Sequence, residues 1–103
     1  MWGTIARFQV TPGKEAFVRG QMQAMSRARL TGWQHISLFE SADHPHELWM
    51  LALFDTEEHY KANAASPTQH AAYLTLRSAC EADPEWHDVN ELLTVRAADQ
   101  PAP

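Results

Sequence analysis

Six histidines are the residues of this chain best suited to chemistry near neutral pH, because imidazole can bind a metal or transfer a proton. No two of them have the i, i+4 spacing that places a pair of zinc ligands on one helix face. His44 and His46 lie in the polar segment 41–47 and, with Asp43, could form a surface metal site, but a solvated loop is the simpler interpretation. We therefore predict no resident metal.

His35 is the histidine with the clearest functional alternative. It alternates with Trp33 and Ser37 in a strand pattern, beside aromatic side chains, and could act as a base in a substrate pocket. A strand histidine that is hydrogen-bonded across a subunit interface gives the same pattern. Both interpretations stay open for this residue.

Two other polar side chains fall on predicted apolar helix faces. Gln21 lies between Phe17 and Met25 on the apolar face of its helix, where an amide needs either a protein partner or a ligand. Tyr73 shares the apolar face of a second helix with Leu76. A tyrosine in such a place is either a core residue with its hydroxyl at the rim or a group that contacts a ligand.

The elements that carry these residues follow the order β-α-β-β-α-β. Alternating apolar residues predict strands, and apolar stripes at helical spacing predict helices. The strands are expected at 2–10, 33–40, 47–54 and 86–95, and the helical regions at 14–29 and 56–83. Ser66-Pro67-Thr68-Gln69 is a capping-box pattern with proline at the first helical position, so the second helical region restarts at Ser66.

This order describes a ferredoxin-like α+β fold, with a four-stranded antiparallel sheet and both helices on one face. We expect a single domain over residues 1–96 and a flexible tail over 97–103. Strand 47–54 is apolar on both of its sides, and strands 2–10 and 33–40 are partly so. Because a sheet face in contact with water should be polar, the helix-free face is expected to be buried in a homodimer.

Composition excludes several classes of partner. Eight basic against thirteen acidic residues leave a net charge of −5, which disfavours binding to nucleic acid. The first residues have no basic leader with an apolar stretch, and no apolar run approaches membrane-spanning length. The single cysteine, Cys80, has no partner for an intrachain disulfide. We expect a cytoplasmic protein that binds neither membranes nor nucleic acid.

Short motifs carry a resemblance to a known family. They are Thr11-Pro12-Gly13-Lys14-Glu15, Gly32-Trp33, Leu38-Phe39-Glu40-Ser41, Leu53-Phe54-Asp55-Thr56-Glu57-Glu58-His59-Tyr60 and Ala65-Ser66-Pro67. In these segments, and over most of its length, the chain resembles the antibiotic biosynthesis monooxygenase family of the dimeric α+β barrel superfamily. That superfamily includes oxygenases, haem-degrading enzymes and proteins of unknown activity, so the motifs indicate the fold more strongly than the reaction.

The haem-degrading branch of the superfamily keeps an Asn, a Trp and an iron-binding His at positions that here hold Ala6, Asn63 and Tyr73. All three are replaced. Tyrosine is a haem ligand in some proteins, so haem binding stays open as an alternative. The resemblance nevertheless argues against haem oxygenation, and we expect no cofactor.

The polyketide-oxidising branch implies a different chemistry, in which a deprotonated phenol or anthrone passes an electron directly to O2. In this chain the resemblance makes Tyr73 the candidate proton acceptor, with Asn63 and Gln21 steadying the enolate oxygen. The remaining candidate residues of an apolar substrate pocket are Thr4, Ala6, Phe8, Phe17, Leu76 and His35. The sequence thus favours a cofactor-independent monooxygenase acting on a small aromatic or quinone-precursor molecule, and the main alternative is a non-catalytic homodimeric module that binds a small ligand. A metal- or haem-using variant and a purely structural dimer with a closed core stay open behind these two.

Overall fold

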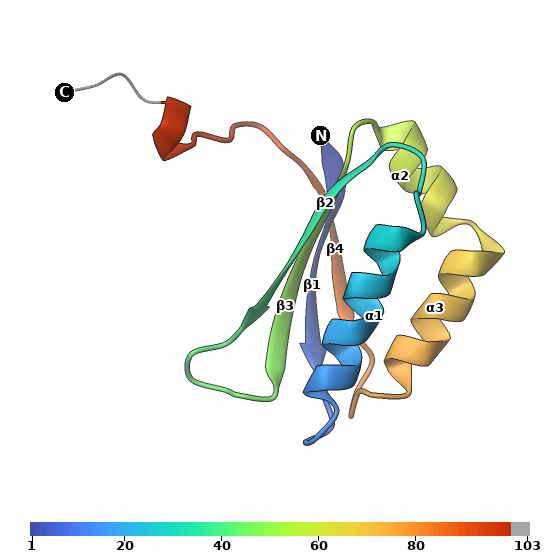
Figure 1. The fold of residues 1–103 in the computed structure, drawn as a ribbon, viewed down its shortest axis with the longest axis vertical. Helices are drawn as coiled ribbons and strands as arrows, with labels where there is room; N and C mark the ends of the chain where they lie inside the picture. Colours follow the sequence, from blue (N-terminus) through green and yellow to red (C-terminus); the bar gives the residue numbers. More distant parts are fainter. Residues whose placement is uncertain (100–103) are drawn as a thin grey trace.

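The computed structural model describes residues 1–99 as a two-layer α+β unit in which three α-helices cover one face of a four-stranded antiparallel sheet (Figure 1). The strands are β1 (Trp2–Gln9), β2 (Trp33–Glu40), β3 (Glu47–Phe54) and β4 (Glu85–Asn90). The helices are α1 (Glu15–Arg27), α2 (Glu57–Ala64) and α3 (Pro67–Arg77), and a single 3-10 turn, η1, spans Ala97–Asp99. The predicted ferredoxin-like fold class is confirmed, with the second helical region divided in two.

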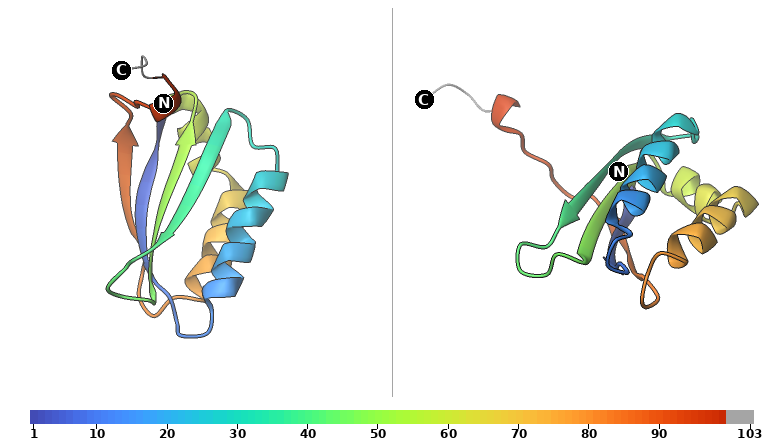
Figure 2. Two further views of the ribbon diagram at one scale, coloured as in Figure 1. Left: turned by 60° about the vertical axis from the view of Figure 1, so that its left-hand side comes forward. Right: turned by 60° about the horizontal axis from the view of Figure 1, so that its bottom comes forward.

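The sheet has the strand order β2-β3-β1-β4, so the two central strands are β3 and β1. The side chains at alternate positions of each strand point to the same face. Figure 2 shows that all the α-helices lie on one side of the sheet and that the opposite side carries no helix. The site and the core are therefore both built on the helix-covered face.

The division between α2 and α3 follows from two local caps. The side chain of Thr56 accepts a hydrogen bond from the backbone N–H of His59 at 3.2 Å, and that of Ser66 accepts one from Gln69 at 3.1 Å. Pro67 occupies the first turn of α3, where its missing N–H leaves no bond unmade. The predicted restart at Ser66 is confirmed.

The core lies between the helices and β1 and β3. Phe8, Val18 and Phe54 are fully buried there. Phe8 and Val18 pack in one apolar cluster with Ala6 and Met22. Burying a large apolar side chain stabilises the folded state by about 1.5–3 kcal/mol, so this layer dominates the stability of the domain. Among the described helices, none is both long and apolar enough to cross a bilayer.

Strand β4 is shorter than the sequence predicted. It ends at Asn90, opposite Trp2, because β1 begins there and offers no further partner beyond the bond from the Glu91 N–H to the Met1 carbonyl at 2.8 Å. The segment 91–95 leaves the sheet as an extended arm (Figure 1) with Leu92 92% exposed. The predicted strand end at residue 95 is therefore wrong. Of the predicted tail, 97–99 form η1 and 100–103 lie outside the described residues.

Candidate functional site

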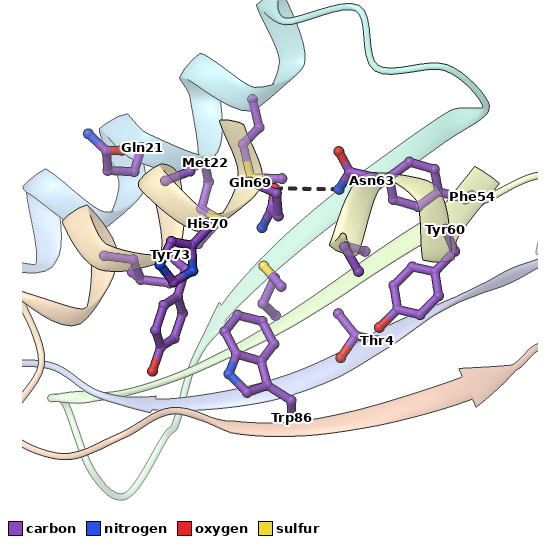
Figure 3. Close-up of a pocket in the computed structure, with 16 residues that line it drawn as sticks. Thr4, Gln21, Met22, Phe54, Tyr60, Asn63, Gln69, His70, Tyr73 and Trp86 are labelled. Atoms are coloured by element: carbon purple, nitrogen blue, oxygen red, sulfur yellow. Dashed lines mark hydrogen bonds between the residues drawn. The ribbon is translucent and has the colours of Figure 1, made fainter. Parts of the chain in front are cut away.

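A cavity of about 270 Å³ lies between the helices and the sheet. Its walls are mainly apolar and include Met22 from α1, Met50 and Ala52 from β3, Leu76 from α3 and Trp86 from β4 (Figure 3). All the helices and three of the strands thus contribute to one internal space. A mainly apolar cavity with a few polar groups is the usual composition of a small-molecule site.

The space exists because small residues meet beneath the helices. Thr4 and Ala52 are directly opposite each other in the β1–β3 pairing, and both line the cavity. Ala64 of α2 and Ala72 of α3 line it from the helical layer. Larger side chains at these positions would occupy the volume, so the local sequence keeps this part of the interlayer space open.

Aromatic side chains form one wall of the cavity. The rings of Tyr73 and Trp86 are tilted against each other with centroids 6.2 Å apart, and His70 stacks on Tyr73 at 6.5 Å. Trp86 is in turn held edge-on against the buried ring of Phe8 at 5.6 Å. These contacts fix the aromatic surface that a planar ligand would meet.

Amide groups lie on the helical side of the cavity. The Asn63 amide nitrogen of α2 donates to the Gln69 side-chain oxygen of α3 at 3.4 Å, which ties the two helices together beside the cavity (Figure 3). Gln21 of α1 also lines the cavity, but its amide points away from Asn63 in the same view. The two amides therefore do not form one cluster.

Tyr60 lies on α2, one helical turn before Asn63, and reaches down to the sheet. Its hydroxyl donates to the Asp88 carboxylate at 2.5 Å, and its ring packs on Phe54 with centroids 5.9 Å apart. The pKa of Tyr60 is raised from 10 to about 12, mainly by burial and secondly by the hydrogen bond to Asp88. Hydrogen bonding with Thr4 lowers this pKa by a smaller amount. The Thr4 hydroxyl donates to the His87 carbonyl at 3.2 Å.

The structure brings most of the predicted polar residues to one cavity. Tyr73, Asn63 and Gln21 all line it, and so do Thr4 and Leu76 from the predicted apolar wall.

The other predicted pocket residues lie elsewhere. Ala6 and Phe8 follow Thr4 on the same face of β1 but are sealed in the core and do not line the cavity. Phe17 is 41% exposed, because the buried face of α1 runs through Val18 and Met22 instead. His35 pairs with Leu53 on the helix-free face, so it cannot reach a ligand in this cavity.

Sequence reasoning missed several lining residues, including Tyr60, Gln69, His70 and Trp86. The spacing of His70 and Tyr73, three residues apart on one helix, was a usable signal. No local pattern pairs Tyr60 with Asp88, because that contact depends on how α2 lies over β4.

Neither a metal cluster nor a reactive thiol is evident. Within residues 1–99, no group of three or more His, Cys, Asp or Glu side chains is arranged to hold a metal ion. Cys80 is buried, and burial raises the pKa of its thiol, which keeps it protonated and unreactive.

Solved structures share this architecture. SnoaB, a cofactor-independent oxygenase from Streptomyces nogalater whose structure was solved as a point mutant, superposes with a TM-score of 0.76 at 17% identity, over 89% of this chain and 93% of its own. Rv0793 from Mycobacterium tuberculosis superposes with a TM-score of 0.71 at 22% identity, over 90% of this chain and 96% of its own. A conserved protein from Methanosarcina mazei superposes with a TM-score of 0.73 at 16% identity, over 85% of this chain and 89% of its own. At these identities the likeness concerns the fold alone.

The fold defines this protein as a member of the ferredoxin-like α+β class. The family model for antibiotic biosynthesis monooxygenases matches residues 1–73, which include β1 to β3, α1, α2 and the Asn63 and Tyr73 positions. The chain therefore belongs to the antibiotic biosynthesis monooxygenase family, as its motifs indicated. No curated protein matches it in sequence.

Proposed function

We propose that this protein is a cofactor-independent monooxygenase that oxidises a small aromatic or quinone-precursor molecule with O2. The observation that carries the proposal is the largely apolar cavity of about 270 Å³ with aromatic walls and few polar groups. Its size is at the small end of known ligand sites, so the substrate is small. The name of SnoaB, a cofactor-independent oxygenase with the same fold, supports this class of reaction.

Tyr73 is the proposed proton-transfer group. It lines the cavity between Trp86 and His70, with ring centroids 6.2 Å and 6.5 Å away. Tyr73 is itself half-buried, so a proton relayed through its hydroxyl or through a water bound to it has a short route to solvent. Trp86 supplies a flat apolar surface on which an aromatic substrate can stack.

Asn63 and Gln21 are the proposed donors to the developing enolate oxygen. The Asn63 amide has two N–H groups, of which one is used by Gln69, so the other is available to a ligand. Gln21 lines another wall of the cavity from α1, and its amide must turn toward the ligand to donate beside Asn63. A hydrogen bond to a developing negative charge is worth more in an apolar cavity than in water.

The proposed reaction balances without a cofactor. Loss of a proton from an acidic C–H or O–H group leaves a carbanion or enolate, which passes one electron to O2. The resulting radicals combine to form a C–O bond. When the peroxide loses water, one oxygen atom remains as a carbonyl and the other leaves in water, so the substrate itself supplies all the electrons. The apolar walls keep bulk water from reprotonating the carbanion.

The alternative is a non-catalytic homodimeric module that binds a small ligand in the same cavity. It is favoured by the chemistry of the walls, because none of the described residues that line the cavity is a carboxylate, a lysine or an arginine. The strongest bases of ordinary side chains are therefore missing from the walls, and Tyr73 and His70 are left to move protons.

We also propose that two copies of the chain pack together through the helix-free faces of their sheets. Ile5, Trp49 and Phe39 on that face are 39%, 37% and 56% exposed, more than large apolar side chains tolerate together on a monomer. Phe39 and Trp49 are paired across β2 and β3, so they form a continuous apolar surface. The arm 91–95, with its exposed Leu92 and Leu93, is free to extend onto the partner.

Substitution of Tyr73 by Phe tests the catalytic proposal. General acid–base groups contribute about 100-fold to 10,000-fold, so Tyr73→Phe should lower the rate of anthrone oxidation by about 100-fold or more. Leu74→Ala is the control, because Leu74 is the next residue, is exposed and does not line the cavity. If Tyr73→Phe binds and oxidises anthrone like the wild type, the proton-transfer role is refuted.

A further inference from the structure

The end of the cavity near β4 holds two hydroxyl groups whose protons are turned away from the cavity. Tyr60 donates its proton to Asp88 at 2.5 Å, and Thr4 donates its proton to the His87 carbonyl at 3.2 Å. Both acceptors belong to β4, the strand beside β1. Asp88 is directly opposite Thr4 in the β1–β4 pairing, which brings the two hydroxyls and the carboxylate together.

The Asp88 carboxylate decides which hydrogen-bonding role the Tyr60 hydroxyl can offer to a ligand. Asp88 is exposed to solvent, and an ionised carboxylate can only accept hydrogen bonds, so the shared proton must come from Tyr60. A phenol has one proton and two lone pairs, and once the proton is committed to Asp88 the oxygen can serve a ligand only as an acceptor. Figure 3 shows the Tyr60 hydroxyl pointing toward Thr4 inside the ring of lining residues.

The Thr4 hydroxyl also offers a ligand an acceptor rather than a donor. While its proton is held by the His87 carbonyl, its oxygen also presents lone pairs. When Thr4 turns its proton toward Tyr60, the phenol oxygen keeps a second lone pair for a ligand. In either arrangement the two hydroxyl oxygens of Tyr60 and Thr4 offer a ligand lone pairs and no proton.

We propose that the Tyr60 and Thr4 hydroxyls form an acceptor site that selects aromatic ligands carrying a hydroxyl group. Asp88 maintains this site by accepting the Tyr60 proton. The site deepens the proposed function, since it rests on the cavity taking an aromatic molecule and adds which molecule it prefers. A ligand hydroxyl donates to the Tyr60 oxygen, whereas an ether or an unsubstituted ring leaves that oxygen unpaired. In this arrangement Tyr60 contacts the ligand and Asp88 is a positioning residue.

A purely structural role for the pair predicts something different. Helix α2 has no fully buried residue, and Tyr60 ties it to the sheet, so losing the bond to Asp88 should loosen α2 in any case. Loosening α2 weakens the binding of every ligand alike. Selection between ligands of the same shape is the property that separates the two roles.

The test measures the affinity of the full-length protein for naphthol, its methyl ether and naphthalene by calorimetry at neutral pH. One net hydrogen bond changes an affinity by roughly threefold to tenfold, so the wild type should prefer naphthol to the methyl ether by that factor. In Tyr60→Phe the preference for naphthol over its methyl ether should fall to about onefold, whatever common loss of affinity the loosened α2 imposes on all three probes.

Asp88→Ala provides an independent second variant, because it removes the exposed acceptor of the Tyr60 proton and keeps the Tyr60 hydroxyl itself. Its naphthol preference should also fall, but through a gain in methyl ether affinity, since the freed Tyr60 proton can now be donated to the ether oxygen. The matched control is Asp55→Ala, which removes another exposed aspartate bonded to α2, through His59 at 2.7 Å, outside the cavity. That variant should keep the naphthol preference.

Two outcomes overturn the proposal and are distinguishable from each other. If naphthalene and naphthol bind with equal affinity, or if Tyr60→Phe and Asp88→Ala keep the full naphthol preference, the acceptor site is refuted and the aromatic cavity stands. If none of the three probes binds, the cavity itself is not an aromatic site, and the proposed function and the acceptor site fail together.

Discussion

Enlarging Ala52 to leucine should stabilise the protein while narrowing the cavity. Ala52 is 4% exposed and points from β3 into the space beneath Met22 and Leu76. In a filled core, three extra carbon atoms at such a buried position would force neighbours apart and cost about 1–3 kcal/mol. Here a cavity of about 270 Å³ is available to receive them.

The expected size of the effect follows from apolar burial. Each buried methylene contributes about 0.8 kcal/mol, so three carbon atoms contribute roughly 2.4 kcal/mol. Fixing the leucine side chain costs about 0.5–1 kcal/mol of conformational entropy. The free energy of unfolding should therefore rise by about 1–2 kcal/mol, which corresponds to roughly 4–16 °C in Tm for a domain of this size.

Thermal and urea unfolding, followed by circular dichroism, measure this change in stability. Naphthol titration measures how much affinity is lost when the leucine takes up cavity volume. The matched control is Ala6→Leu, because Ala6 lies on the same face of the neighbouring strand, opposite Met50, but is fully buried and does not line the cavity. Overpacking at Ala6 should lower the free energy of unfolding by about 1–3 kcal/mol.

The two variants together decide whether the space is real. If Ala52→Leu destabilises the protein as much as Ala6→Leu does, the interlayer space is already filled in solution and the reasoning from the cavity is wrong. If Ala52→Leu is stabilising but leaves naphthol affinity unchanged, naphthol does not bind against the Ala52 wall of the cavity.

Three further predictions concern other parts of the molecule. Hemin incubated with the protein and a reductant should keep its Soret band with no open-chain tetrapyrrole formed, because Ala6, Asn63 and Tyr73 replace the haem-degrading set; protein-dependent tetrapyrrole formation would contradict this. Because the pKa of Tyr60 is raised from 10 to about 12, its contribution to stability is complete below pH 10 and lost as the pH rises through 12. Ultraviolet titration should show a phenolate step near pH 12 that Tyr60→Phe removes, and a step near pH 10 instead would refute the assignment. Light scattering should give a dimer for the wild type and a monomer for Trp49→Asp, whereas Leu74→Asp, at an exposed leucine on the helical side, should stay dimeric. A wild-type monomer at micromolar concentration would refute the proposed interface.

The fold was largely predictable because its signals are local. Strands β2 and β3 begin and end where the two apolar runs indicated, and the Ser66 cap with Pro67 placed the start of α3. The strand end at Asn90 was not predictable in the same way. The residues that follow it are apolar enough to continue a strand, but a strand needs a partner, and β1 supplies none beyond its first residue.

The candidate site was predictable only in part, because it depends on contacts between distant segments. Tyr73 and Gln21 stood out as polar residues on apolar helix faces, and both line the cavity. Phe17 has the right spacing for the buried face of α1 but lies just beyond the area that the sheet covers. The Tyr60–Asp88 bond joins residues 28 positions apart, and no periodicity in the sequence reports it.

Oxygen consumption by metal-free protein supplied with an anthrone is the measurement that tests the central proposal most directly. We predict that the wild type consumes one O2 for each anthrone, faster than the protein-free reaction and unaffected by chelators, with one atom of isotopically labelled oxygen retained in the quinone. Ala52→Leu, with part of its cavity occupied by the leucine side chain, should oxidise anthrone more slowly than the wild type. Wild-type consumption no faster than in the protein-free solution, despite bound anthrone, would contradict a monooxygenase and leave the ligand-binding module in its place.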